Sequence, residues 1–142
     1  MVVAMEYGTD FSDGGGDRDW ALLKLDRPLG DRYDWLGWLA IRDYSDLSWS
    51  EGKINLAGYS GDFPADAPGE TPSVHLGCSL RGVREDGRIL HDCDTMPGAS
   101  GSPLLGKFAD GNYYVLGLHT SGISEAMTGR AIANLAIPQD AP

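Results

Sequence analysis

The sequence predicts an all-β protein, and three observations lead to this fold class. The 142 residues include 20 glycines and 8 prolines, so turns are frequent. Short runs of β-type residues recur along the chain, mostly separated by clusters of Gly, Pro, Asp or Asn. Only residues 31–44 show a hint of helical period. Short strands at this spacing indicate a sandwich or barrel, and the length suits one domain at most.

The expected strands are rich in β-branched, aromatic and other apolar residues, which favour a pleated, half-buried surface. They span residues 2–7, 20–25, 53–59, 73–80, 88–94, 102–108 and 113–120. Residues 8–19 join the first two strands, and residues 61–72 form a solvated loop by their composition. Trp35 and Trp38 lie in the weakly helical stretch, and we expect them to pack in a core or an interface.

Charge and hydropathy exclude several classes of partner. The chain carries 11 Lys and Arg against 21 Asp and Glu, a net charge of −10. Nucleic acid is therefore excluded as a partner, because neutralising phosphates requires clustered basic residues. No run of about 18 or more apolar residues is present, so we expect no membrane-spanning helix and no membrane partner. Residues 1–10 lack the basic and apolar segments of a signal peptide.

Two cysteines, Cys78 and Cys93, flank the turn signal at residues 85–87. Because both flanks read as strands, the segment is typical of a β-hairpin that brings the cysteines nearly opposite one another. At that separation a disulfide can form, which indicates an oxidising compartment. Two buried free thiols are the alternative.

A zinc site is a further interpretation of the same segment. His75 with Cys78 and His91 with Cys93 loosely mimic pairs of zinc ligands. His91 and Cys93 share a face of a strand, whereas His75 and Cys78 point to opposite faces. A four-ligand tetrahedral site therefore does not assemble easily, and we predict no metal and no other cofactor.

The strongest chemical signal is the segment Gly98-Ala99-Ser100-Gly101-Ser102-Pro103. Its glycines let the backbone bend so that a serine hydroxyl is presented and backbone N–H groups converge. Such N–H groups stabilise the charge that develops during acyl transfer. A serine also needs a base and an orienting acid to act as a nucleophile. Taken alone, a Gly/Ser segment is usually only a turn.

Two other segments accompany this turn. Asp19 stands immediately before the apolar residues 20–25, and the order of Asp before Ser fits a triad whose histidine comes first. Residues 117–122 (GLHTSG) supply a strand end with a glycine that could border a cleft. The alternatives are that Asp19 is a solvated loop acid and that His119 is a hydrogen-bonded core histidine.

These three segments resemble the chymotrypsin-like serine proteases, in particular their bacterial glutamyl-endopeptidase branch, over residues 2–136. The resemblance implies two antiparallel six-stranded β-barrels with the active site between them. It implies that Ser100 is the nucleophile and that Asp19 orients the catalytic histidine. The backbone N–H groups of Gly98 and Ser100 would form the oxyanion hole.

The resemblance also assigns the substrate pocket. Thr95 and His119 match positions that line the pocket for P1, the residue whose carbonyl is attacked, in glutamyl-specific relatives. Thr120 would support the aspartate, and Gly122 would pair with the substrate backbone as an added strand. Asp94 stands where an acid gives trypsin its preference for basic residues, but we favour an acidic P1. Thr95 can also be an ordinary strand residue.

One departure from the family pattern concerns the histidine, which the family places well before the aspartate. No histidine precedes Asp19 in this sequence, since the three histidines are His75, His91 and His119. We therefore expect a partial protease domain that lacks an N-terminal segment. Residues 1–40 would be the end of the first barrel with its connection, and residues 41–142 the nearly complete second barrel.

The function expected from the resemblance is a serine endopeptidase, inactive alone, acting on a peptide or protein. The resemblance and the disulfide imply a secreted or periplasmic location. The alternative is a non-catalytic protease-like domain that binds protein partners.

Overall fold

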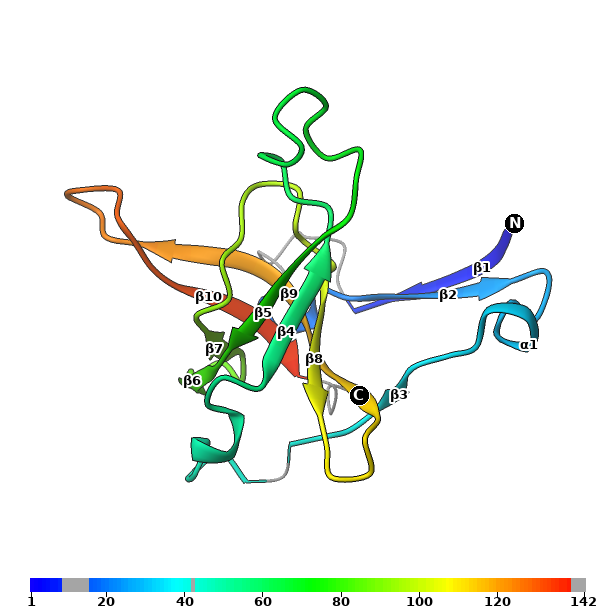
Figure 1. The fold of residues 1–142 in the computed structure, drawn as a ribbon, viewed down its shortest axis with the longest axis horizontal. Coiled ribbons are helices and arrows are strands. Elements are labelled where there is room, and N and C mark those ends of the chain that lie inside the picture. The colour runs from blue at the N-terminus through cyan, green and yellow to red at the C-terminus, as the bar shows by residue number, and fades with distance from the viewer. Residues whose placement is uncertain (9–15, 42, 139–142) are drawn as a thin grey trace.

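Two β-sheets make up nearly all the regular structure in residues 1–8, 16–41 and 43–138, the part of the chain that the computed structural model describes (Figure 1). The strands are β1 (Val2–Tyr7), β2 (Ala21–Leu25), β3 (Gly37–Trp38), β4 (Ile54–Gly58), β5 (Ser73–Cys78), β6 (Leu80–Val83), β7 (Ile89–His91), β8 (Pro103–Lys107), β9 (Tyr113–Ser124) and β10 (Ala131–Pro138). Single helical turns lie at α1 (Gly30–Tyr33), η1 (Gly16–Arg18) and η2 (Ser48–Ser50). The predicted all-β class is therefore correct.

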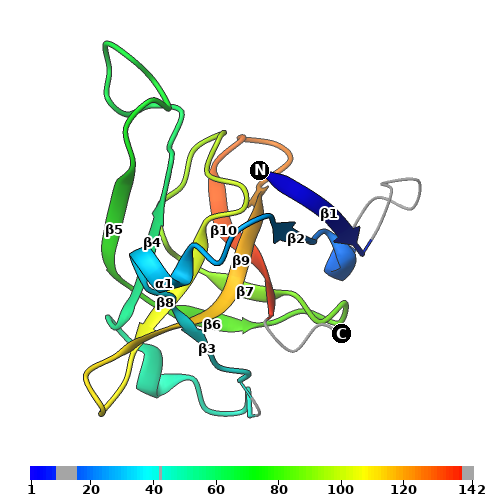
Figure 2. The ribbon, with the colours of Figure 1, turned by 90° about the vertical axis from the view of Figure 1, so that its right-hand side faces the viewer.

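The larger sheet contains eight strands in the order β5-β4-β8-β9-β10-β7-β6, with β3 paired to β9. Figure 2 shows this sheet curling around on itself. Ile54, Ile89, Leu104 and Leu116 come from β4, β7, β8 and β9, and all four side chains are fully buried inside the curl. Burying each such side chain stabilises the fold by about 1.5–3 kcal/mol, so this core holds the curled sheet together.

The smaller sheet consists of β1 and β2 alone, paired antiparallel. In Figure 1 it extends away from the curled sheet. Every residue of both strands is exposed, including Met5 at 60% and Leu22 at 65%. An isolated pair of strands is only marginally stable in water, so these apolar side chains lack the cover that strands of a closed barrel would have.

The cysteine hairpin forms as predicted. Strands β6 and β7 pair antiparallel, and a disulfide joins Cys78 to Cys93 with a Cα–Cα distance of 4.9 Å. Both cysteines are buried. The alternative of free thiols is therefore wrong, and the zinc alternative loses both of its sulfur ligands.

Strand β10 and the last third of β9, residues 121–124, are missing from the strands expected from sequence. Ala, Asn and Pro make up five of the eight residues of β10, so the segment is a weak strand signal, and its pairing with β9 and β7 stabilises it. Residues 31–44 hold only most of α1 and β3 among their described positions, and α1 ends at Tyr33, before Asp34, whose φ is 61°. The helices within the described ranges are single turns, too short to span a bilayer.

Candidate active site

Ser100 lies on a tight turn that two hydrogen bonds tie to β9. The N–H of Gly101 donates to the carbonyl of His119 at 2.8 Å, and the N–H of His119 donates to the carbonyl of Ser102 at 2.8 Å. Gly101 has φ +86°, which L side chains rarely adopt. Ala99 is buried while Ser100 is exposed. The alanine side chain of the turn therefore packs into the protein, and the serine side chain faces solvent.

Two backbone N–H groups beside the serine remain available. Among the described residues, the N–H groups of Gly98 and Ser100 make no hydrogen bond, although their neighbour Ala99 donates to the carbonyl of Met96 at 3.1 Å. Gly98 has φ +103°, and a Cβ there would lie 3.3 Å from the carbonyl oxygen of Tyr59. The turn therefore requires glycine at this position, and it leaves two donors for an oxyanion.

The Ser100 hydroxyl donates to the carbonyl of Thr120 at 2.9 Å. The hydroxyl of Thr120 in turn donates to the carbonyl of Leu135 in β10 at 3.4 Å. No hydrogen bond joins Ser100 to a histidine within the described ranges. The serine is thus held by β9 and not by a base.

Asp19 and Ser100 line one cavity of about 730 Å³, although they are far apart in sequence. His119 and Thr120 border it from β9, and the remaining lining residues are Met5, Tyr7, Trp20, Ala21, Gly101 and Leu118. Asp19 is half-buried and lies two residues before β2. The cavity therefore lies between the two sheets, with the acid on one side and the serine on the other.

His119 forms a buried pair with His91. The sequence pattern connected His119 with the site, but not His91. Nε2 of His91 lies 3.2 Å from Nδ1 of His119, and the rings meet edge to face. Burial, and then the charge of His119, lowers the pKa of His91 from 6.5 to about 4. Burial also lowers the pKa of His119, against an opposing contribution from the carbonyl of Leu135. Both rings are therefore neutral near pH 7.

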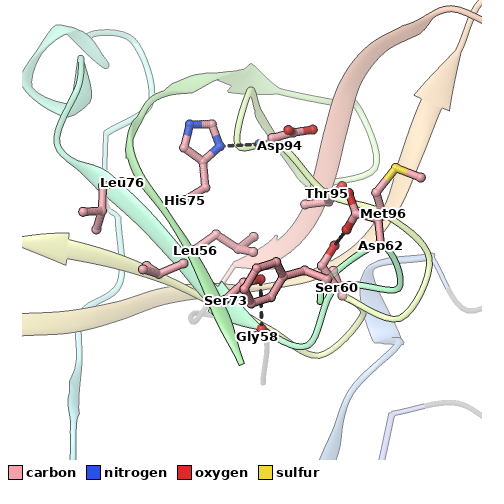
Figure 3. Close-up of a pocket in the computed structure, with 13 residues that line it drawn as sticks. Leu56, Gly58, Ser60, Asp62, Ser73, His75, Leu76, Asp94, Thr95 and Met96 are labelled. Atoms are coloured by element: carbon pink, nitrogen blue, oxygen red, sulfur yellow. Dashed lines mark hydrogen bonds between the residues drawn. The ribbon is translucent and has the colours of Figure 1, made fainter. Parts of the chain in front are cut away.

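Thr95 does not line the cavity of Ser100. It lines a second cavity, of about 450 Å³, between residues 94–96, β5 and residues 58–63 (Figure 3). Asp94 also borders this second cavity, and its N–H donates to Nδ1 of His75 at 2.6 Å. The structure thus places Thr95 and His119, the two residues predicted to share the P1 pocket, on different cavities.

Asn134 holds Thr95, one of the two residues of the predicted P1 pocket. Its Nδ2 donates to the carbonyl of Cys93 at 2.7 Å, and its Oδ1 accepts from the hydroxyl of Thr95 at 2.9 Å. It pairs with Gly122 of β9 on one side and with His91 of β7 on the other. No sequence pattern pointed to Asn134, because its role depends on the register of three strands.

Comparison with known proteins bears on the fold. No protein-family model matches the sequence, and no curated protein matches it. Among solved structures the chain is similar to a Glu endopeptidase solved in complex with MPD, with a TM-score of 0.69 and 17% identity. The match covers 97% of this chain and 58% of that one, so this chain spans less than two thirds of that endopeptidase's length. The likeness shows that the fold is the chymotrypsin-like all-β barrel.

Proposed function

We propose that this chain is part of a serine endopeptidase in which Ser100 is the nucleophile. Ser100 Oγ bonds to the carbonyl carbon of a peptide, its proton passes through a histidine base to the leaving amine, and water then hydrolyses the acyl-enzyme. The observation that carries the proposal is the exposed Ser100 flanked by two unbonded N–H groups, of Gly98 and of Ser100 itself, within the described residues. The barrel fold shared with a Glu endopeptidase supports it.

We infer that the base is none of the three histidines of residues 1–142 where the structure places them. His75 lies on the second cavity, and His91 is fully buried. His119 borders the cavity of Ser100, but the serine hydroxyl donates to Thr120 and not to that ring. We assign Asp19 the role of orienting the incoming imidazole, because it lines the same cavity as Ser100. The disulfide supports a secreted or periplasmic location.

Free imidazole can replace the absent base in a direct test. The chain is treated with p-nitrophenyl acetate with and without imidazole, and the acylated residue is identified by mass spectrometry. We expect Ser100 to be acetylated with release of p-nitrophenolate, at a rate that rises with imidazole concentration. Ser100→Ala abolishes the labelling, whereas Ser124→Ala, at an exposed serine ending β9, leaves it unchanged. Equal labelling of wild type and Ser100→Ala contradicts the proposal.

A second candidate, a non-catalytic domain that binds protein partners, is favoured by one observation. The exposed apolar strands β1 and β2 offer a surface and free edges on which another chain could pair. Absence of acylation of Ser100 at every imidazole concentration favours this candidate over the protease.

A further inference from the structure

We propose that a third cavity binds a quaternary ammonium group, such as the trimethylammonium of choline. The cavity has a volume of about 430 Å³ and lies between residues 35–37, at the start of β3, and residues 111–114, at the start of β9. Trp35, Tyr113 and Tyr114 line it, so three aromatic rings border one space. In the described part of the chain it shares no lining residue with the cavity of Ser100, so the inference does not depend on the proposed function.

The pairing of β3 with β9 brings these rings together. The two strands run parallel, with Gly37 opposite Tyr114. The N–H of Leu39 donates to the carbonyl of Val115 at 3.0 Å, which continues this pairing. A Cβ on residue 37 would lie 2.8 Å from two ring carbons of Tyr114, so the close approach requires glycine. Trp35 is 77% exposed, so its ring is open to a ligand and is not part of a core.

The ring of Tyr114 is held in place and is electron-rich. Its hydroxyl donates to Oδ2 of Asp110 at 2.7 Å, and this hydrogen bond is the main cause that lowers the pKa of Asp110. The carboxylate is therefore ionised near pH 7, and its charge shifts electron density from the hydroxyl into the ring. Phe108 meets the same ring edge to face, with the centroids 5.6 Å apart. The negative face of such a ring attracts a cation.

A cation of the protein itself already lies over one ring of the cavity. Nζ of Lys107 is 5.5 Å from the centroid of the Tyr113 ring, within the range of a cation–π interaction. Lys107 pairs with Tyr113 across β8 and β9, and both residues are exposed. This contact shows that the aromatic surface accommodates an ammonium group. The flexible stem of the lysine can move aside for a ligand.

Charge and hydrogen bonding favour a quaternary cation over other ligands that stack on aromatic rings. The chain carries a net charge of −10, which attracts cations and repels anions. The carboxylate of Asp110 already accepts hydrogen bonds from the Tyr114 hydroxyl and from both the N–H and Nδ2 of Asn112. A sugar or a primary ammonium would need free acceptors there. A quaternary ammonium has no N–H to donate, so it needs only the rings and the negative charge.

Choline and 3,3-dimethylbutan-1-ol are the matched probes, since the alcohol has the shape of choline without its charge. Each is titrated into the isotope-labelled full chain, and the NMR shift of the Gly111 amide, which lies on the lining of the cavity, reports binding. We expect choline to bind about tenfold more tightly than the alcohol, because the aromatic faces and the Asp110 carboxylate attract only the cation. Equal binding of the two probes, or no shift with choline, overturns the inference.

Three variants connect this preference to the proposed contacts. Trp35→Leu should weaken choline binding about tenfold. Trp38→Leu is the matched control, since Trp38 is 64% exposed on β3 but does not line the cavity, and it should leave choline binding unchanged. Lys107→Met removes the competing ammonium from the Tyr113 ring and should strengthen choline binding about threefold. An unchanged affinity in Trp35→Leu, or an equal loss in Trp38→Leu, contradicts the inference.

A last measurement distinguishes a lipid headgroup from a free ion as the source of the quaternary ammonium. Wild type and Trp35→Leu are sedimented with phosphatidylcholine vesicles. Retention that is lost in Trp35→Leu assigns the group to the lipid, whereas choline binding without such retention assigns it to a free ion. None of these measurements involves Ser100, so a negative result leaves the proposed function standing.

Discussion

The two sheets of this molecule differ sharply in how they bury their residues. In the eight-stranded sheet, β8 alternates buried and less buried positions, and Leu104 is fully buried. In the two-stranded sheet, every residue of β1 and β2 is exposed. The serine turn is attached to the well-packed sheet, whereas Asp19 lies two residues before β2 of the smaller sheet. The candidate site therefore joins a well-packed sheet to a marginally stable one.

Hydrogen exchange should reveal the largest difference between the two sheets. Since β1 and β2 have little buried surface, their amides should exchange through local opening, while β8 and β9 exchange only when the barrel unfolds. We expect exchange in β1 and β2 to be about 1,000-fold faster than in β8 and β9, as measured by NMR. Equal protection in both sheets would show that the smaller sheet is held as firmly as the larger one.

Truncation of one leucine in each sheet should sharpen the contrast. Leu104→Ala leaves a cavity in the core, and we expect the free energy of unfolding to fall by about 2–5 kcal/mol. Leu22→Ala, at a side chain that is 65% exposed, should change it by no more than about 0.5 kcal/mol. Urea denaturation of both variants checks the prediction. A similar loss of unfolding free energy in Leu22→Ala would mean that another surface covers β2 in solution.

Acid should destabilise the larger sheet through its histidine pair. In the folded chain the pKa of His91 is about 4, against 6.5 without burial. Between these values the unfolded chain takes up a proton that the folded chain refuses, so stability falls as the pH drops from 6.5 to 4. The loss attributable to His91 is about 3 kcal/mol at most. Unfolding curves across this pH range measure it.

The His91→Gln variant is the control for this pH dependence, because its side chain does not titrate. We expect its stability to change less between pH 6.5 and 4 than that of the wild type. An unchanged dependence of stability on pH in His91→Gln would assign the acid sensitivity to other groups.

Asp86 is a carboxyl whose contribution lies at lower pH. Hydrogen bonds with Arg88 are the main cause that lowers its pKa to about 2. Its stabilising effect is therefore lost mainly below pH 4.

The smallest expected effect concerns Asp19, which precedes β2 of the smaller sheet. If Asp19 orients an imidazole bound in the cavity, Asp19→Asn should slow imidazole-assisted acylation of Ser100 by about tenfold. The matched control is Asp31→Asn on α1, which does not line the cavity and should leave the rate unchanged. An unchanged rate in Asp19→Asn would remove this residue from the proposed mechanism.

Local patterns made part of this structure predictable from the sequence. The cysteine hairpin follows from two strand-like runs around one turn, and the serine turn follows from glycines at fixed positions. The contact between Thr95 and Asn134 could not be predicted, because it depends on how β10 aligns with distant strands. A register shift between Leu135 and Ala136 adds to that difficulty. The pairing of His91 with His119 was hidden for the same reason, since the two rings come from β7 and β9.

A structure of the acetylated chain tests the role of Ser100 most directly. If the turn is an acyl-transfer site, the acetyl group is attached to Ser100 Oγ. Its carbonyl oxygen should then lie about 2.7–3.1 Å from the backbone nitrogens of both Gly98 and Ser100. An acetyl group on another residue, or a carbonyl oxygen on Ser100 that neither N–H reaches, would contradict the proposal that this turn performs acyl transfer.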